Sequence, residues 1–145
     1  MSKHSKNNRQ PNKYCCIILF LIGSSILSTT SLASRCPTEL HRDNKGYWTS
    51  NTPPGWKSIT RTPSSETLDP NNFGGTVYSS TNKRIACVYR SSKRRWVALL
   101  SNINHPFNED DLKGTVWKYV PKHKDSICGK PDHGLHDCEF DLHVP

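Results

Sequence analysis

The sequence predicts an all-β protein: a small antiparallel sheet or sandwich stabilised by two disulfides. The predicted strands are short runs of alternating apolar and polar residues, and clusters of Pro, Gly, Asn and Ser separate these runs. Beyond the N-terminal segment, no ten-residue stretch has the 3.6-residue apolar period of an amphipathic helix. Four cysteines remain beyond that segment, an even number that suits a disulfide framework.

The segment 83–101 predicts a β-hairpin around which the other elements are arranged. Apolar side chains alternate through residues 85–90, where Ile85, Cys87 and Tyr89 define one face, and the alternation returns in residues 95–100. The polar residues 91–94 between the two runs turn the chain. We expect all four tryptophans to be core residues, because each lies on or beside a predicted strand and an indole buries a large area. They are Trp48, Trp56, Trp96 and Trp117.

Further strands are predicted on both sides of this hairpin. The strand at 75–79 leads through a turn at 80–82 into the hairpin, so that these three strands form a meander. Residues 60–72 are rich in Ser, Thr, Pro and Asn and predict a long surface loop. The remaining predicted strands are 46–49, 56–59 and 114–120, and residues 102–111 are predicted to be loop.

Residues 1–33 are typical of a signal peptide. Four Lys and Arg residues and no acid precede an apolar run over residues 14–27, and Ser31 and Ala33 place small residues where signal peptidase requires them. We therefore predict cleavage after Ala33 and a periplasmic or secreted product. An uncleaved anchor is the alternative, although the run is shorter than the roughly 20 apolar residues of a spanning helix. Arg35 argues against a lipoprotein, because lipidation needs a small residue before the cysteine.

Removal of residues 1–33 from the 145-residue chain leaves a single domain, 34–145, of 112 residues. The whole chain has a formal net charge of +8, but the signal segment contains four of its twenty Lys and Arg and none of its twelve acids. Sixteen cations against twelve acids remain, a net charge of +4. The basicity of the whole chain is therefore not evidence of nucleic-acid binding.

The four remaining cysteines predict two disulfides, for which three pairings are possible. Cys128 and Cys138 enclose a short segment with Gly and Pro, and short loops close at low entropic cost. We favour this pair, which leaves Cys36 to join Cys87 in the hairpin. Each bridge contributes about 2–4 kcal/mol to stability. With only 33% hydrophobic residues, a chain of this size needs that contribution.

Several framework residues resemble a family of small exported gamma-proteobacterial proteins that is classed as a domain of unknown function. The resemblance rests on Cys36-Pro37, Gly55-Trp56-Lys57, the Cys87-x-Tyr89 strand, Gly114-Thr115-x-Trp117 and the late Cys128 and Cys138-x-Phe140 pair. It implies an exported, β-rich, disulfide-bonded domain. It implies no activity and no catalytic residues.

Two groups of residues could carry chemistry, but the sequence favours neither. Asp132, His133, His136 and Cys138 offer zinc ligands, but a disulfide at Cys138 would consume the thiolate, so we expect no metal and no cofactor. A secreted hydrolase or toxin, such as a small nuclease, is the alternative function. Its acid–base groups would come from His105, His123, His133 and Glu109. The chain lacks the nucleophile, zinc-protease and phosphate-loop motifs, so we expect no enzyme.

The most unusual charge feature is a set of six cations with no acid among them: Lys83, Arg84, Arg90, Lys93, Arg94 and Arg95. This basic cluster predicts contact with an anionic surface, such as lipid headgroups, lipopolysaccharide or an acidic protein; nucleic acid is the less favoured partner. Protection of a strand edge by solvated charges is the simpler explanation. The sequence thus predicts a monomeric binding protein of unidentified ligand.

Overall fold

The computed structural model describes residues 32–101 and 106–142. Within them the protein is all-β, with ten strands and one short 3₁₀ helix, η1 (Glu109–Asp111). The strands are β1 (Leu32–Ser34), β2 (His41–Arg42), β3 (Trp48–Asn51), β4 (Pro54–Ser58), β5 (Leu68–Ser79), β6 (Arg84–Ser91), β7 (Trp96–Ser101), β8 (Lys118–Val120), β9 (Asp125–Gly129) and β10 (Phe140–Leu142). The predicted fold class is confirmed.

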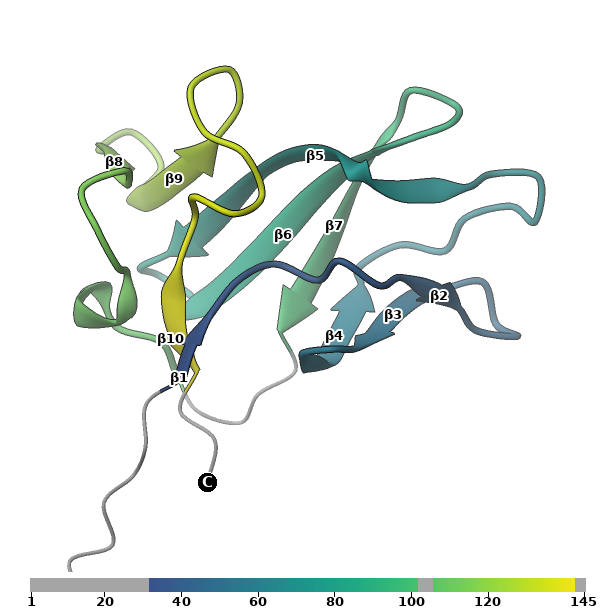
Figure 1. The fold of residues 1–145 in the computed structure, drawn as a ribbon, viewed down its shortest axis with the longest axis horizontal. Helices are drawn as coiled ribbons and strands as arrows, with labels where there is room; N and C mark the ends of the chain where they lie inside the picture. Colours follow the sequence, from purple (N-terminus) through teal and green to yellow (C-terminus); the bar gives the residue numbers. More distant parts are fainter. Residues whose placement is uncertain (1–31, 102–105, 143–145) are drawn as a thin grey trace, which may run out of the picture.

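Eight strands form one antiparallel sheet in the order β2-β3-β4-β7-β6-β5-β9-β8. Strands β5, β6 and β7 are adjacent at its centre and form the predicted meander. Strands β1 and β10 pair separately, and this two-stranded ribbon lies across one face of the sheet (Figure 1). The edge strands β2 and β8 are short and carry His41, Arg42 and Lys118, features that discourage edge-to-edge pairing.

The core lies between the ribbon and the face of the sheet that it covers, which we call the inner face. Ile85, Cys87 and Tyr89 of β6 point into it and are fully buried, as the alternation predicted. From the ribbon, Phe140 packs against Trp56 of β4 with ring centroids 6.0 Å apart. Burying these apolar side chains is the main source of stability.

Both disulfides have the favoured pairing. Cys36–Cys87 joins the N-terminal segment to β6 at the centre of the sheet. Cys128–Cys138 joins β9 to the loop that precedes β10. Next to the first bridge, the Tyr89 hydroxyl donates a hydrogen bond to the carbonyl oxygen of Pro37 at 2.6 Å. Burial raises the pKa of the Tyr89 phenol, which therefore stays a neutral hydrogen-bond donor.

The sequence predicted two strand boundaries wrongly and missed one strand. Residues 68–72 belong to β5 and not to a loop, because Leu68 is buried and pairs with Ser91 across an irregular register. Only Lys118–Val120 of the predicted strand 114–120 is extended and paired, and Gly114 has a φ of +75°. Strand β9 was not predicted, because Ile127 is its single large aliphatic residue and points away from the core.

The prediction that Trp96 is a core residue was also wrong, since its side chain is 60% exposed. Trp48 and Trp56 are buried, and Trp117 is half-buried against the core. The phase of the strand explains the difference. Val97 and Leu99 of β7 point to the inner face, so Trp96 points to the opposite face, where it pairs with Arg90.

The predicted signal peptide lies outside the described residues except for its last two, Leu32 and Ala33, which belong to β1. Cleavage after Ala33 would leave Ser34 as the one residue of β1. Within the described ranges, no helix has the length and apolar character needed to cross a membrane.

Candidate functional site

The second face of the sheet, which we call the outer face, is largely apolar. Val77 of β5 pairs with Ile127 of β9 on one side and with Ala86 of β6 on the other, and Ala86 pairs with Leu100 of β7. Directly opposed residues of an antiparallel sheet point to the same face. These four side chains therefore form one continuous apolar row across four strands.

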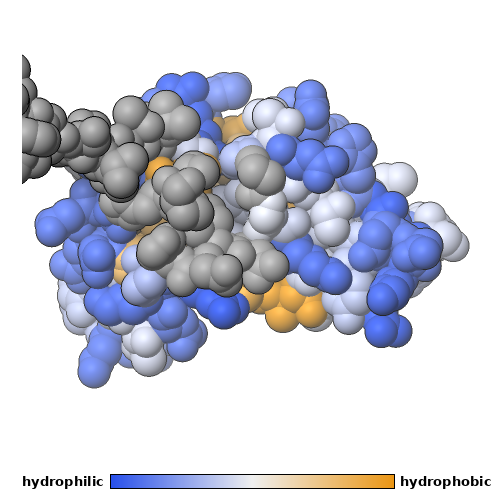
Figure 2. Space-filling view, turned by 90° about the horizontal axis from the view of Figure 1, so that it is seen from below, coloured by the Kyte–Doolittle hydropathy of each residue, from blue (hydrophilic) through white to orange (hydrophobic). Residues whose placement is uncertain are grey.

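A second row runs beside the first. Val88 of β6 pairs with Ala98 of β7 and with Gly75 of β5, and the amide of Ile59 donates to the carbonyl of Ala98 at 3.0 Å. Ile59 is 57% exposed and Ile127 is 40% exposed. Seen from below, the part of the surface that is not drawn in grey is mainly hydrophilic, with a few hydrophobic patches (Figure 2). An exposed apolar surface built from neighbouring residues marks a contact site more often than scattered single residues do.

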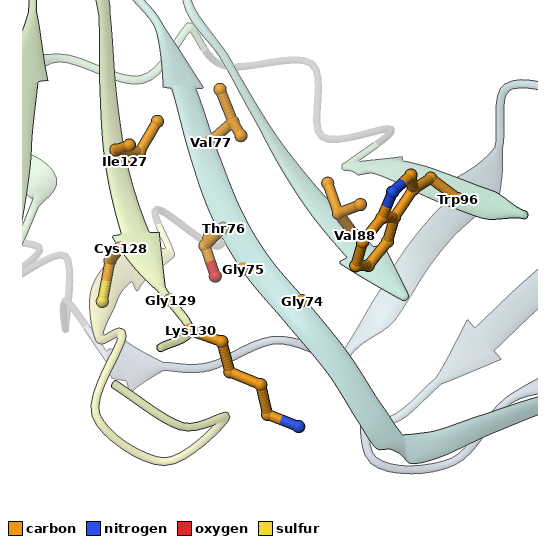
Figure 3. Close-up of a pocket in the computed structure, with 10 residues that line it drawn as sticks. All are labelled: Gly74, Gly75, Thr76, Val77, Val88, Trp96, Ile127, Cys128, Gly129 and Lys130. Atoms are coloured by element: carbon orange, nitrogen blue, oxygen red, sulfur yellow. The ribbon is translucent and has the colours of Figure 1, made fainter. Parts of the chain in front are cut away.

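A groove of about 350 Å³ is hollowed into this outer face (Figure 3). Its floor is backbone, because Gly74 and Gly75 of β5 and Gly129 of β9 have no side chains to fill it. A Cβ on Gly129 would lie 2.4 Å from the Cα of Gly75, so the two strands approach as closely as they do only because both residues are glycines. The sequence therefore builds the groove by omitting side chains.

Trp96 forms one wall of the groove. A Cβ on Gly74 would lie 2.4 Å from Cζ3 of Trp96, so the indole occupies the space above that glycine. The Arg90 guanidinium lies 5.4 Å from the centre of the indole ring, within the range of a cation–π contact. Trp96 is thus a large, exposed aromatic surface held in place by its neighbours.

A second hollow of about 360 Å³ continues the outer face toward the β5–β6 turn. It shares Val77 with the groove and is lined further by Ala86, Leu100 and Arg84, together with Ser79 and Asn82. The outer face therefore presents two neighbouring hollows that share Val77.

Cationic side chains surround this apolar centre. Lys57 and Lys118 lie at the two ends of the first row, opposite Leu100 and Ile127 respectively. Arg84 pairs with Ser79, and Arg90 pairs with Trp96. Lys130 follows Gly129 and lines the groove. Asp125, which pairs with Ser79, is an acid on the same face.

The structure disperses the predicted basic cluster. Lys83 and Arg84 lie at the β5–β6 turn, whereas Lys93 and Arg94 lie at the β6–β7 turn. The eight residues of β6 separate the two turns, a span of roughly 25 Å for an extended strand. Of the six cations, Arg84 and Arg90 belong to the outer face.

Arg95 has a structural partner. Its Nε donates to Oε1 of Glu66 at 3.1 Å and its second nitrogen donates to Oε2, which makes a two-point ion pair. Glu66 is only 1% exposed. The Arg95 guanidinium holds the pKa of the Glu66 carboxyl below its ordinary value of 4.5. Arg95 therefore serves the fold by stabilising a buried carboxylate, a role that the run of basic residues in the sequence did not reveal.

The residues proposed for a metal site or for hydrolysis lie elsewhere. Cys138 is disulfide-bonded, and among the described residues no group of three or more His, Cys, Asp or Glu side chains could hold a metal ion. His105 lies outside the described residues, and neither His123, His133 nor Glu109 lines any of the hollows described here.

A third hollow, of about 460 Å³, does bring a histidine and a carboxylate together. His136 and Glu139 line it with Arg35, whose guanidinium is ion-paired with Glu139. The sequence suggested His136 only as a candidate zinc ligand, and it did not suggest Glu139 for any site.

No protein-family model, curated protein or solved structure matches this chain. The resemblance to small exported gamma-proteobacterial proteins therefore stays a hypothesis.

Proposed function

We propose that this protein is an exported, monomeric binding protein that contacts an anionic lipid surface through the outer face of its sheet. One observation carries the proposal: the outer face, which no strand among residues 32–101 and 106–142 covers, has an apolar centre surrounded by five cationic side chains, Lys57, Arg84, Arg90, Lys118 and Lys130. Lipid surfaces combine anionic headgroups with an apolar interior, and a protein that binds them gains from both apolar burial and charge.

The apolar centre favours lipid over other anionic partners. An acidic protein or a nucleic acid is recognised mainly by charge and polar contacts. Between Lys118 and Lys57, the first row of the outer face has only apolar side chains and makes no such contacts. Each Lys or Arg near an anionic membrane contributes about 1 kcal/mol. The exposed side chains of Ile59 and Trp96 add apolar and aromatic contact area at the same surface.

The proposed location outside the cytoplasm agrees with the cysteine chemistry. Four cysteines form two disulfides, which are typical of oxidising compartments. The signal-peptide pattern of residues 1–33 supports a periplasmic or secreted destination. Membership of the gamma-proteobacterial family named above is part of the same proposal.

The test is co-sedimentation with phosphatidylcholine vesicles that contain or lack phosphatidylglycerol, at low and at physiological salt. We expect binding to the anionic vesicles alone, weaker at high salt because counterions screen the contact. The double variant Arg84→Glu/Arg90→Glu should weaken binding more than about tenfold, because two contributions of about 1 kcal/mol are lost and reversed.

The matched control is Lys93→Glu/Arg94→Glu, which makes the same charge change at the β6–β7 turn. If the control pair weakens binding as much as the outer-face pair, the contact is made by net charge or by the hairpin tip. Parallel samples with lipopolysaccharide, an oligonucleotide and an acidic protein test the other partners. Tighter binding to the oligonucleotide or the acidic protein than to any lipid would refute the proposal.

Hydrolysis is the second candidate function, and the hollow shared by His136, Glu139 and Arg35 is the observation that favours it. A histidine and a carboxylate can act as an acid–base pair, and an arginine can stabilise a phosphoryl charge. A ribonuclease assay of the wild type against His136→Ala tests it. Activity that disappears in the variant would establish a nuclease, and equal background in both proteins would exclude one at this site.

A further inference from the structure

We propose that the groove beside Trp96 holds a single saturated acyl chain of an anionic amphiphile, with the anionic head beside Lys130. This inference rests on the proposed function and deepens it, because it names the part of the lipid that enters the protein. A carboxylate head would belong to a fatty acid and a phosphate head to a phospholipid, and the experiment separates the two.

The shape and chemistry of the groove fit an unbranched hydrocarbon. At about 350 Å³ it lies at the small end of the roughly 300–1,000 Å³ that ligand sites occupy. Val77 and Ile127 lie at one end, and Val88 and the Trp96 indole form the side. The backbone floor at Gly74, Gly75 and Gly129 lets a narrow chain lie close to the sheet.

The charges at the groove fit an anionic head. Lys130 lies at the other end of the groove from Val77 and Ile127, and its side chain extends from the end of β9 toward β5 (Figure 3). Its backbone amide donates to the carbonyl of Gly74 at 3.2 Å, which anchors the residue at the groove floor. The ten lining residues include this one cation and no acid. The polar end of the groove is therefore positive.

The indole of Trp96 provides a built-in reporter. Its side chain is 60% exposed, so a hydrocarbon seated against it would remove much of its contact with water. Trp48 and Trp56 are already buried and would change little. The part of the emission that changes on binding should therefore disappear in Trp96→Phe, which keeps an aromatic wall.

The experiment titrates the disulfide-bonded domain with octanoate, decanoate and dodecanoate below their micelle concentrations, by calorimetry and Trp emission. We expect affinity to rise about threefold to fourfold for each added methylene, the value for burial of one CH₂ group. Dodecyl phosphate tests the phosphate head, while dodecyl maltoside and dodecyltrimethylammonium test neutral and cationic heads. In amide NMR spectra, shifts should concentrate at Gly74, Gly75 and Gly129.

Matched variants locate the site. Val88→Phe fills the groove and should lower dodecanoate affinity more than about tenfold, because the chain loses its contact surface. Val116→Phe makes the same change at a partly buried valine that lines none of the three hollows, and it should have little effect. If Val88→Phe fails to fold, Ile127→Phe fills the groove from a partly exposed position. Lys130→Gln should remove the preference for anionic heads and keep the chain-length dependence, whereas Lys122→Gln should change neither.

Equal dodecanoate binding by Val88→Phe and wild type, or affinity independent of chain length, would overturn the inference. So would a doubled molecular mass in light scattering that the amphiphile reverses, because a second copy would then be the natural occupant. These results are separable from those on vesicles. If wild type and Val88→Phe bind anionic vesicles equally and neither binds the free amphiphiles, the proposed function stands and the acyl-chain site is refuted. If the wild type binds the free amphiphiles but no vesicles, the acyl-chain site stands and the proposed function is refuted.

Discussion

Trp96 of β7 lies over Gly74 of β5, so close that a Cβ on the glycine would stand 2.4 Å from Cζ3 of the indole. This relationship determines what the outer face can do. The glycine leaves space for an exposed indole. The indole forms a wall beside the glycine floor, and wall and floor together make the groove.

Gly74 lies against a side chain and Gly129 lies against backbone, so replacing each by alanine should lower the unfolding free energy by different amounts. In Gly74→Ala the new methyl group meets an exposed indole that can swing away, so we expect a loss below about 1 kcal/mol and a red-shifted Trp emission. In Gly129→Ala the new methyl group meets the backbone of Gly75 and Gly74, which cannot move without shifting a strand. We expect this variant to lose about 1–3 kcal/mol of unfolding free energy. Urea unfolding measures both, and equal losses would contradict the account of the groove floor.

Trp96 and Trp56 should respond oppositely to truncation. Trp96→Ala should cost less than about 1 kcal/mol, because surface substitutions rarely cost more. Trp56 is 1% exposed and packs on Phe140, so Trp56→Ala should cost about 3–5 kcal/mol. The urea midpoints of the two variants check this. A large loss for Trp96→Ala would return that residue to the core and remove it from the outer face.

Glu66 should make stability depend on pH. Its pKa is lowered in the folded state, chiefly by the hydrogen bond from Arg95, so its contribution is present above the unfolded pKa. The contribution is lost as the pH falls below the ordinary value of 4.5 through the folded pKa. Glu66→Gln should flatten this part of the curve of unfolding free energy against pH.

Arg95→Ala leaves the same carboxylate buried without its partner. The Arg95 side chain is 56% exposed, so solvent screens part of the pair, and we expect a loss of unfolding free energy at pH 7 that is clearly larger than the control's. Lys93→Ala, two residues away, is the control and should change stability little. Unfolding at pH 7 and pH 3 measures both, and an Arg95→Ala loss as small as the control's would mean that the pair contributes nothing.

The two disulfides should contribute unequally. Cys36–Cys87 closes a loop with a sequence separation of 51, and Cys128–Cys138 closes one of 10. Loop-closure entropy predicts contributions of about 4 and about 2.7 kcal/mol respectively. Replacing each pair by alanines and measuring the unfolding free energy tests this order. Thiol labelling of the denatured, unreduced domain should detect no free cysteine among these four.

Sequence reasoning predicted the centre of the fold well. The alternation at Ile85, Cys87 and Tyr89 identified the inner face of β6, and the short loop between Cys128 and Cys138 identified the disulfide pairing. Both features are local in the sequence. Strand β9 was missed because its pairing with β5 depends on a close approach of Gly129 and Gly75, which no local pattern encodes.

The outer face was missed for a related reason. Alternation distinguishes a buried face from a polar one, but residues 96–100 of β7 are apolar at every position. Such a run is typical of a strand with two apolar faces, and the run alone does not show which of the two faces is covered. Charge was misleading in the same way: six cations near one another in sequence lie at opposite ends of β6, and one of them is paired with a distant, buried Glu66.

The most direct test of the proposed binding surface is quenching of Trp emission by anionic vesicles that carry a spin label on their acyl chains. Spin-label quenching acts over short distances, so it reports which tryptophan touches the lipid. We expect strong quenching of the wild type and little quenching of Trp96→Phe, although both proteins co-sediment with the vesicles. Bound wild-type protein without quenching, or equal quenching of the two proteins, would show that the outer face does not contact the lipid.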